Sequence, residues 1–137
     1  MNLRGYVSSR QFMNERVPQN IQNLVLRDFC KKNDFKFFLS ATEYAMQDSY
    51  MILYKTISEL NKLDGIVMYS LRQLPENHEA RETIFEKIIK QEKILYFALE
   101  NKFISSWDEA HLINEIINVI LLQNSTPYKV NLKNLKS

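Results

Sequence analysis

The amino-acid sequence predicts an α/β protein with a four-stranded parallel sheet, strand order 2-1-3-4, and helices on both faces. Short, nearly continuous apolar runs alternate along the chain with longer segments whose apolar residues recur at helical spacing. Right-handed crossovers between such runs give a parallel sheet that helices cover on both sides. With 137 residues, 45% hydrophobic and 25% charged, the chain has the length and composition of one globular domain.

Four short apolar runs are the predicted strands. They comprise residues 3–8, 35–40, 65–70 and 94–99. Each is apolar at nearly every position, which is typical of a strand buried on both faces. Each also ends in polar residues, so the carboxyl ends of the strands should lie at the surface.

Four helices alternate with these strands. Pro18 opens the first at its favoured initial position, Asp48 can cap the second, and Asn77 can cap the third. Ser106 and Glu109 have the spacing of a capping box at the start of the fourth. The resulting order βαβαβαβα is flavodoxin-like in its broad class.

The fourth helix also predicts association. Its apolar residues between positions 112 and 122 cover more than one side of the helix. A helix that is apolar on several sides is usually buried on several sides. We therefore expect a homo-oligomer, a dimer or higher, with twofold symmetry.

The charges and the single cysteine restrict the function classes. The chain has 18 Lys and Arg against 16 Asp and Glu, but three of the lysines lie in the acid-free residues 124–137, a basic tail after a domain of residues 1–123. The remaining basic and acidic residues nearly balance, so the domain has no general basic face, which disfavours nucleic acid as a partner. Cys30 alone cannot form an internal disulfide, and no apolar run reaches the length of a membrane span. Both observations predict a cytoplasmic protein.

Motifs for standard cofactor chemistry are missing. Gly5 and Gly65 are the only glycines, so neither a phosphate loop nor a dinucleotide fingerprint can be written anywhere in the chain. His78 and His111 have no carboxylate at ligand spacing, and no histidine lies near Ser8 to activate its hydroxyl. The sequence therefore predicts no cofactor and no metal.

Polar residues at the strand ends predict a ligand site. The carboxyl ends of parallel strands meet at one edge of a sheet, where helix N-termini also present unpaired N–H groups. In the order 2-1-3-4, the ends of the first and third strands should face one cleft. The candidate site residues are Ser8, Ser9, Arg10, Arg16, Gln19, Thr42, Glu43, Tyr69, Ser70, Gln73 and Glu100.

The residue types at this edge indicate an anionic ligand. Arg10 and Arg16 can hold an anion by forked hydrogen bonds, beside the dipole of the first helix. Glu43 is the candidate acid or base, and Tyr69 can donate a proton or stack on a ring. We assign catalysis to Glu43, Tyr69 and Arg10, and substrate binding to the other candidates. A sugar or its phosphate would fit such a pocket.

Two segments within the first 75 residues resemble the catalytic domain of serine recombinases, the resolvase and invertase family. They are residues 5–9 (GYVSS) and residues 64–74 (DGIVMYSLRQL). Ser8 stands where that family has an arginine, and Arg10 stands where it has the nucleophilic serine. Residues 71–74 (LRQL) replace its Leu-Asp-Arg-Leu. The resemblance therefore implies a resolvase-like fold without strand cleavage.

Motifs along most of the chain are similar to those of the sporadic carbohydrate cluster proteins, a small bacterial family. They are residues 4–10 (RGYVSSR), 16–19 (RVPQ), 39–46 (LSATEYAM), 64–70 (DGIVMYS), 73–75 (QLP) and 97–100 (FALE). Members are encoded among surface-polysaccharide genes. This resemblance implies sugar biosynthesis for capsule or O-antigen, without specifying a reaction.

Three hypotheses of function follow. The first is a cofactor-independent enzyme of surface-polysaccharide biosynthesis that acts on a sugar phosphate or a nucleotide sugar. The second is a non-catalytic sugar-binding or partner subunit of another carbohydrate enzyme. The third is a recombinase-derived, DNA-associated protein without cleavage activity, which the near-neutral domain makes the weakest of the three.

Overall fold

The structure is a computed structural model that describes residues 1–44 and 49–125. The predicted cap Asp48 and the part of the predicted tail from residue 126 onward lie outside the described residues. The elements, in chain order, are β1 (Asn2–Ser8), α1 (Gln19–Lys32), β2 (Lys36–Glu43), α2 (Met51–Ser58), β3 (Gly65–Met68), the 3-10 helix η1 (Leu71–Gln73), α3 (His78–Lys90), β4 (Ile94–Phe97), β5 (Lys102–Ile104) and α4 (Trp107–Ser125).

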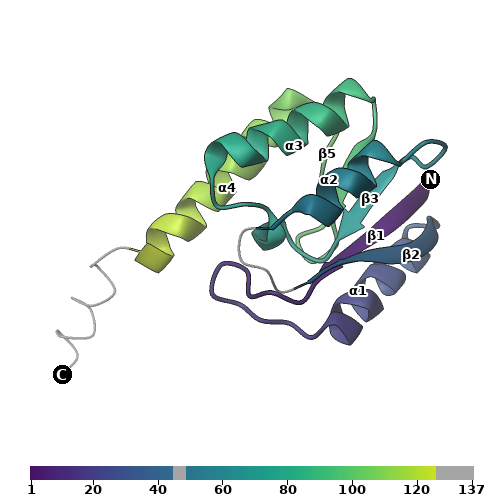
Figure 1. Ribbon diagram of the computed structural model, residues 1–137, viewed down its shortest axis with the longest axis horizontal. Coiled ribbons are helices and arrows are strands. Elements are labelled where there is room, and N and C mark those ends of the chain that lie inside the picture. Colours follow the sequence, from purple (N-terminus) through teal and green to yellow (C-terminus); the bar gives the residue numbers. More distant parts are fainter. Residues whose placement is uncertain (45–48, 126–137) are drawn as a thin grey trace.

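A single sheet forms the centre of the molecule, with its strands in the order β2-β1-β3-β4-β5 (Figure 1). The first four strands run parallel in the predicted order. The predicted count of four is wrong, because β5 adds a fifth strand antiparallel to β4. The chain reverses between them through Asn101, which has a left-handed φ of 54°. A three-residue strand shows too little alternation to be recognised in a sequence.

Close packing between strands explains both glycines. A Cβ atom at Gly65 would collide with the backbone carbonyl of Ile94 on the neighbouring β4. A Cβ atom at Gly5 would meet the side chains of Ser40 and Phe37 on the neighbouring β2. The glycines therefore allow the strands to approach, and neither lies in a ligand loop.

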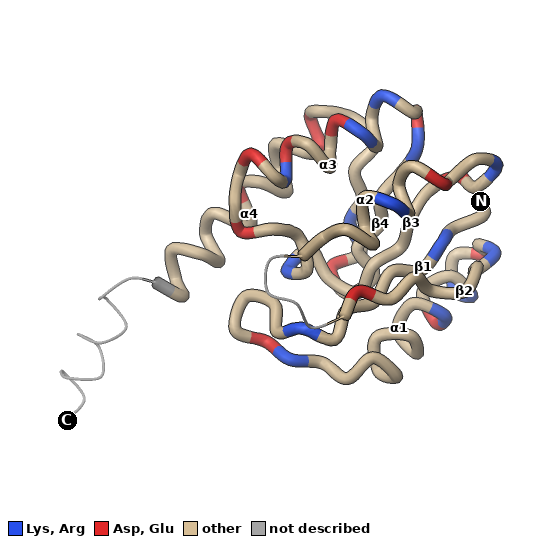
Figure 2. Tube along the Cα trace, in the orientation of Figure 1, with Lys and Arg blue, Asp and Glu red and all other residues tan. Residues whose placement is uncertain are grey.

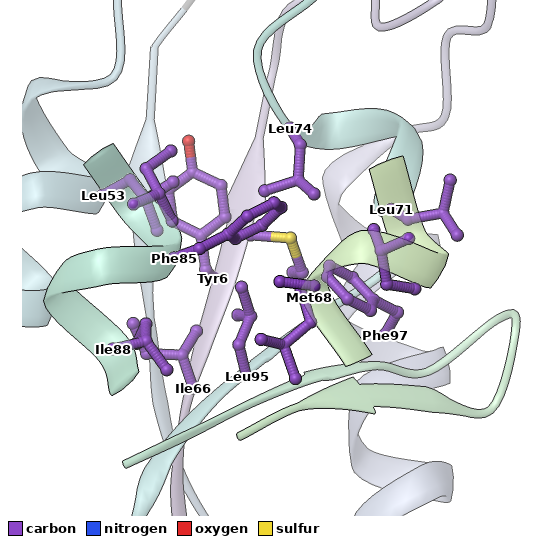
Figure 3. Close-up of a cluster of buried hydrophobic side chains, with 14 of the residues drawn as sticks. Tyr6, Leu53, Ile66, Met68, Leu71, Leu74, Phe85, Ile88, Leu95 and Phe97 are labelled. Carbon is purple, nitrogen blue, oxygen red and sulfur yellow. The ribbon is translucent and has the colours of Figure 1, made fainter. Parts of the chain in front are cut away.

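Helices cover both faces of the sheet, as the sequence predicts (Figure 1). On one face, Leu26 and Phe29 of α1 belong to a buried apolar cluster with Val67 of β3. On the other face, side chains of α2, α3 and α4 form a larger cluster with the strands. Figure 3 shows the Tyr6 ring among the apolar side chains of this larger cluster, including Phe85 of α3.

Local signals set the starts of two helices. Asn77 caps α3 as predicted, since its side-chain oxygen accepts a hydrogen bond from the backbone N–H of Ala80 at 2.9 Å. At the start of α4, the Glu109 carboxylate accepts from the backbone N–H of Ser105 at 2.8 Å and from the Ser106 hydroxyl at 3.2 Å. In a capping box the Glu109 carboxylate would accept from the backbone N–H of Ser106. Here it accepts from the backbone N–H of the preceding residue, Ser105.

The final helix extends beyond the layers of the domain (Figure 1). Ile113 and Ile117 of α4 are buried against the sheet, whereas Leu112, Val119 and Leu122 are more than half exposed. The predicted homo-oligomer, which rests on this apolar surface, stays a prediction. Within the described part of the chain, none of the helices combines the length and apolarity needed to span a membrane.

Candidate functional site

The polar residues at the ends of β1 and β3 bind one another below the surface. Gln73 donates from Nε2 to the Ser8 hydroxyl oxygen and to Gln22 Oε1, both at 3.0 Å. Gln22 donates to the Ser8 carbonyl at 2.7 Å and accepts from the Ser8 N–H at 3.1 Å. All three residues are 0% exposed. This set, which we call the buried amide network, ties the start of α1 and the loop after β3 to the end of β1.

A second group of bonds shapes the short helix η1 after β3. The Ser70 hydroxyl accepts from the Arg72 N–H at 3.1 Å and donates to Glu100 Oε2 at 2.6 Å. The other Glu100 oxygen accepts from the Leu71 N–H at 3.0 Å. Glu100 and Ser70 therefore hold the backbone from which the Arg72 side chain projects.

Glu43, at the end of β2, caps α2. Its carboxylate oxygens accept from the backbone N–H groups of Ile52 at 3.0 Å and Leu53 at 3.2 Å, and from the Tyr6 hydroxyl at 3.0 Å. The carboxylate thus lies with its negative charge at the positive end of this helix. Glu43 is 2% exposed, so the geometry assigns it a structural role, and its acid or base role stays a prediction.

Burial of this cluster changes the chemistry of Tyr6. Loss of hydration raises the pKa of the Tyr6 phenol well above its ordinary value, with Glu43 adding to this effect and Arg10 opposing it. The phenol therefore stays protonated at physiological pH and links the two charged groups through its hydroxyl.

Arg10 lies between the buried residues and the surface. Its two terminal nitrogens donate to the Ser49 carbonyl at 2.9 Å, the Tyr6 hydroxyl at 3.2 Å and the Gln73 carbonyl at 3.5 Å. Its guanidinium carbon also lies 4.1 Å from the centre of the Tyr50 ring. No carboxylate of the described residues forms a salt bridge with Arg10, although it is only 8% exposed.

A cavity of about 400 Å³ opens beside Arg10 at this edge of the sheet. We call it the arginine pocket, because three arginines from separate segments line it. Its lining residues are Arg10, Gln11, Phe12, Met13, Asn14, Arg16, Tyr50, Arg72, Leu74 and Glu76. Arg16 is exposed, and Arg72 has one carboxylate near it, that of Glu15 at 3.7 Å. The pocket therefore has more positive than negative charge on its walls.

A tight turn forms one wall of the pocket. Phe12 and Glu15 exchange two backbone hydrogen bonds, at 2.8 and 2.9 Å. The two residues between them, Met13 and Asn14, have φ angles of 46° and 68°. Such a turn usually contains glycine or asparagine, so a left-handed methionine is unusual there. Its side chain is 6% exposed and packs in the larger core cluster, which holds the turn in place.

The structure separates the predicted site residues into an inner and an outer group. We expected Ser8, Arg10, Tyr69 and Gln73 to line one cleft, but only Arg10 lines the arginine pocket. Ser8, Ser70 and Gln73 are 0% exposed. Polar side chains at strand ends can bond to one another as readily as to a ligand, and a sequence does not distinguish these outcomes.

The remaining predicted residues lie around this edge of the sheet. Ser9 is half-buried and donates to the Glu43 carbonyl at 3.4 Å. Tyr69 packs against Phe12, with ring centres 6.3 Å apart, and burial raises its pKa. Thr42 lines a separate cavity of about 430 Å³. Gln19 is the first residue of α1 and is half-buried.

Sequence reasoning missed three residues of this region. Gln22 carried a detectable signal, because it is a polar residue four positions before Leu26 on the buried side of α1. Arg72 lies between the predicted site residues Ser70 and Gln73, but it was not itself among the predicted site residues. Tyr50 had no signal, since its place beside Arg10 depends on how α2 docks.

Outside the pocket, residues of both charges occur close together along the chain (Figure 2). Figure 2 shows basic and acidic residues interspersed along α3. The concentration of arginine at the pocket is therefore local. A local cluster cannot be detected from the net charge of the chain.

Comparisons with known proteins support the fold. No family model matches the chain, and no curated protein matches it. A crystal structure of the N-terminal catalytic domain of TP901-1 integrase is similar to it, with a TM-score of 0.61 and 14% sequence identity. The match covers 85% of this chain and 92% of that one. This likeness supports the resolvase-like fold that the serine recombinase resemblance implies.

The same comparison corrects the functional expectations. Nothing supports the resemblance to the sporadic carbohydrate cluster proteins. The predicted role in capsule or O-antigen biosynthesis, with a sugar phosphate or nucleotide sugar as ligand, is wrong, because the similar structure is an integrase catalytic domain. The expectation that nucleic acid is not a partner is corrected for the same reason. That expectation rested on the net charge of the domain, which does not reveal a local cluster of arginines such as the one at the pocket.

Proposed function

We propose that the chain is a DNA-associated protein that binds the phosphate backbone through the arginine pocket and does not cut the strand with a serine at the end of β1. One observation carries the proposal: Arg10, Arg16 and Arg72 line one cavity at the carboxyl end of a sheet whose fold is similar to that of an integrase catalytic domain.

The chemistry of the pocket suits a phosphate group. A guanidinium offers paired N–H donors whose geometry matches two phosphate oxygens, and it keeps its charge at all physiological pH values. Arg16 is exposed, and Arg72 is held by the capped helix η1, so both can reach a ligand without refolding. The helix α1 begins just after Arg16 and adds the positive end of its dipole to the same region.

The serines of this region favour binding over cleavage. A nucleophilic serine needs an accessible hydroxyl and a group that activates it. The Ser8 hydroxyl is buried and accepts a hydrogen bond from Gln73, and the Ser9 hydroxyl donates to a backbone carbonyl. Arg10 occupies the position that holds the nucleophile in the serine recombinase pattern.

Salt-dependent binding tests this function. Fluorescence anisotropy with a labelled DNA fragment, repeated over a series of salt concentrations, gives both the affinity and the number of phosphate contacts. We expect Arg16→Ala and Arg72→Ala each to weaken binding about tenfold, equivalent to about 1.4 kcal/mol. Each should also reduce the slope of log K against log salt by about 1.

Arg27→Ala is the matched control. It removes one exposed arginine on α1, where the guanidinium lies over the Phe37 ring and outside the pocket. Arg27→Ala should change the affinity less than twofold, and the melting temperatures of all three variants should stay within about 3 °C of the parent. Binding that is insensitive to salt, or that Arg27→Ala weakens as much as the pocket variants do, would contradict the proposal.

A further inference from the structure

The arginine pocket is larger than a phosphate contact requires. Its volume of about 400 Å³ lies within the range of cavities that hold small organic ligands, which begins at about 300 Å³. Phosphates on the outside of a double helix are reached by side chains that project from a protein surface, without a cavity. The pocket therefore has room for a larger chemical group beside a phosphate.

Its walls also differ in chemical character. The arginines are accompanied by the aromatic residues Phe12 and Tyr50 and by Leu74. The Arg10 guanidinium already stacks over the Tyr50 ring at 4.1 Å. Aromatic rings and guanidinium planes are the surfaces on which proteins stack unpaired bases.

One acidic residue of the pocket indicates where a base could lie. Glu76 is exposed and lines the same cavity as the three arginines. A carboxylate repels a second phosphate, but it can accept hydrogen bonds from the exocyclic amino group of cytosine. The charges therefore divide the pocket into a part suited to a phosphate and a part suited to an amino-bearing base.

Arg10 provides an observation independent of the shape. Its Nε atom is buried and, among the described residues, has no hydrogen-bond partner. Buried donors without acceptors are rare in folded proteins and often occur where a ligand or water completes the site. Since Arg10 lines the pocket and is only 8% exposed, a ligand oxygen that enters deeply could supply the missing acceptor.

We propose that the arginine pocket receives one unpaired nucleotide of DNA, with its phosphate at the arginines and its base beside Tyr50 and Glu76. This inference rests on the proposed DNA association and adds a preference to it. A paired base must leave its stack before it can enter a pocket, and that step costs free energy. The protein should therefore bind single-stranded DNA more tightly than duplex DNA.

Anisotropy with one labelled strand, alone and annealed to its complement, measures this preference. We expect the single strand to bind at least about tenfold more tightly than the duplex. Gln11→Trp places a large side chain at an exposed lining position without changing the charge, and should remove most of this difference. Gln123→Trp, at an exposed position on α4 outside the pocket, is the matched control and should preserve it.

Competition separates a nucleotide pocket from a phosphate site. Deoxycytidine monophosphate should displace the labelled strand at a concentration at least about tenfold below that of inorganic phosphate. Equal displacement by both, or equal binding of single strand and duplex with both weakened by Arg16→Ala, would overturn the nucleotide pocket and leave the DNA association standing. If neither the single strand nor the duplex binds at low salt, the DNA association itself is overturned.

Discussion

The buried amide network and the arginine pocket lie within a few residues of each other in the sequence, yet they differ in how their polar groups are satisfied. In the network, Ser8, Gln22 and Gln73 bind one another and are fully buried. In the pocket, Arg16 is exposed, and Arg72 forms one long, partly exposed ion pair with Glu15 at 3.7 Å. Polar groups that satisfy one another stabilise a fold, whereas charged groups left open to a cavity are available to a ligand.

Because of this difference, we expect two neighbouring sets of polar residues at one edge of the sheet to have different roles, one in stability and the other in binding. Residues of the network should affect the free energy of unfolding, and residues of the pocket should affect DNA affinity. Arg10 contacts both regions, so its behaviour decides where the boundary lies.

Removing the centre of the network should produce the largest effect. Gln73→Ala deletes two donors and the acceptor of the Ser70 N–H, leaving buried polar atoms of Ser8 and Ser70 without partners. We expect the free energy of unfolding to fall by about 3 kcal/mol. Urea unfolding followed by circular dichroism measures it. Gln11→Ala, an exposed glutamine of the pocket, is the control and should cost less than about 0.5 kcal/mol. Similar losses for the two variants would erase the distinction between the regions.

Replacing Arg10 should lower both stability and binding. Arg10→Met keeps the apolar stem but removes the bonds to the Ser49 carbonyl and to the Tyr6 hydroxyl, which in turn bonds the buried Glu43. We expect a loss of about 2 kcal/mol in the free energy of unfolding and about tenfold in DNA affinity. Unfolding and anisotropy measurements on one preparation would show both. A variant that is more stable than the parent would assign Arg10 to the pocket alone.

Alkaline pH should reveal the smallest effect, through Tyr6. Its pKa in the folded protein lies above the ordinary value of 10.0, chiefly because the phenol is buried. The folded state therefore keeps a proton that the unfolded chain loses. The contribution of the Tyr6 phenol to the free energy of unfolding is therefore fully present below about pH 10. Above that pH the free energy of unfolding falls, by at most about 1.4 kcal/mol per pH unit.

Urea unfolding between pH 8 and pH 11 can isolate this contribution. The free energy of unfolding of Tyr6→Phe should fall less steeply with pH than that of the parent, whatever its value at neutral pH. Tyr54→Phe, a half-buried tyrosine of α2, should keep the parent's slope. Identical slopes for the parent and Tyr6→Phe would show that the Tyr6 phenol ionises as freely in the fold as outside it.

Most of the sheet could be predicted because its signals are local. The apolar runs of β1 and β3, the cap Asn77 and the helical periodicity depend on neighbouring residues, and they predicted the alternation of strands and helices. The order of the four parallel strands followed from the flavodoxin-like class that this alternation indicates. β5 was missed because three residues show too little pattern, and the cap of α2 was missed because Glu43 reaches that helix from the end of another element.

The candidate site was predictable only to the level of its location. Arg10 and Arg16 were selected from the strand-end argument and both line the pocket. Ser8, Gln73 and Glu100 were selected by the same argument and bond to other residues of the fold, and their part in ligand binding stays a prediction. The polarity of a residue shows that it needs hydrogen bonds, but it does not show whether the partner is another residue of the fold or a ligand.

The sequence by itself determined the four parallel strands, the four α-helices and the edge of the sheet at which the polar residues gather, because periodicity, caps and strand endings act over a few positions. Only the tertiary structure decided which of those polar residues turn inward and which line a cavity. Gln22 and Gln73, 51 positions apart, form a hydrogen bond because α1 and η1 both pack at the end of β1. Arg72, next to Gln73 in the sequence, instead lines the pocket together with Arg16. Whether a polar residue turns inward or lines the cavity depends on how whole helices and strands pack together. That packing must form the buried hydrogen bonds and the apolar contacts across the sheet at the same time.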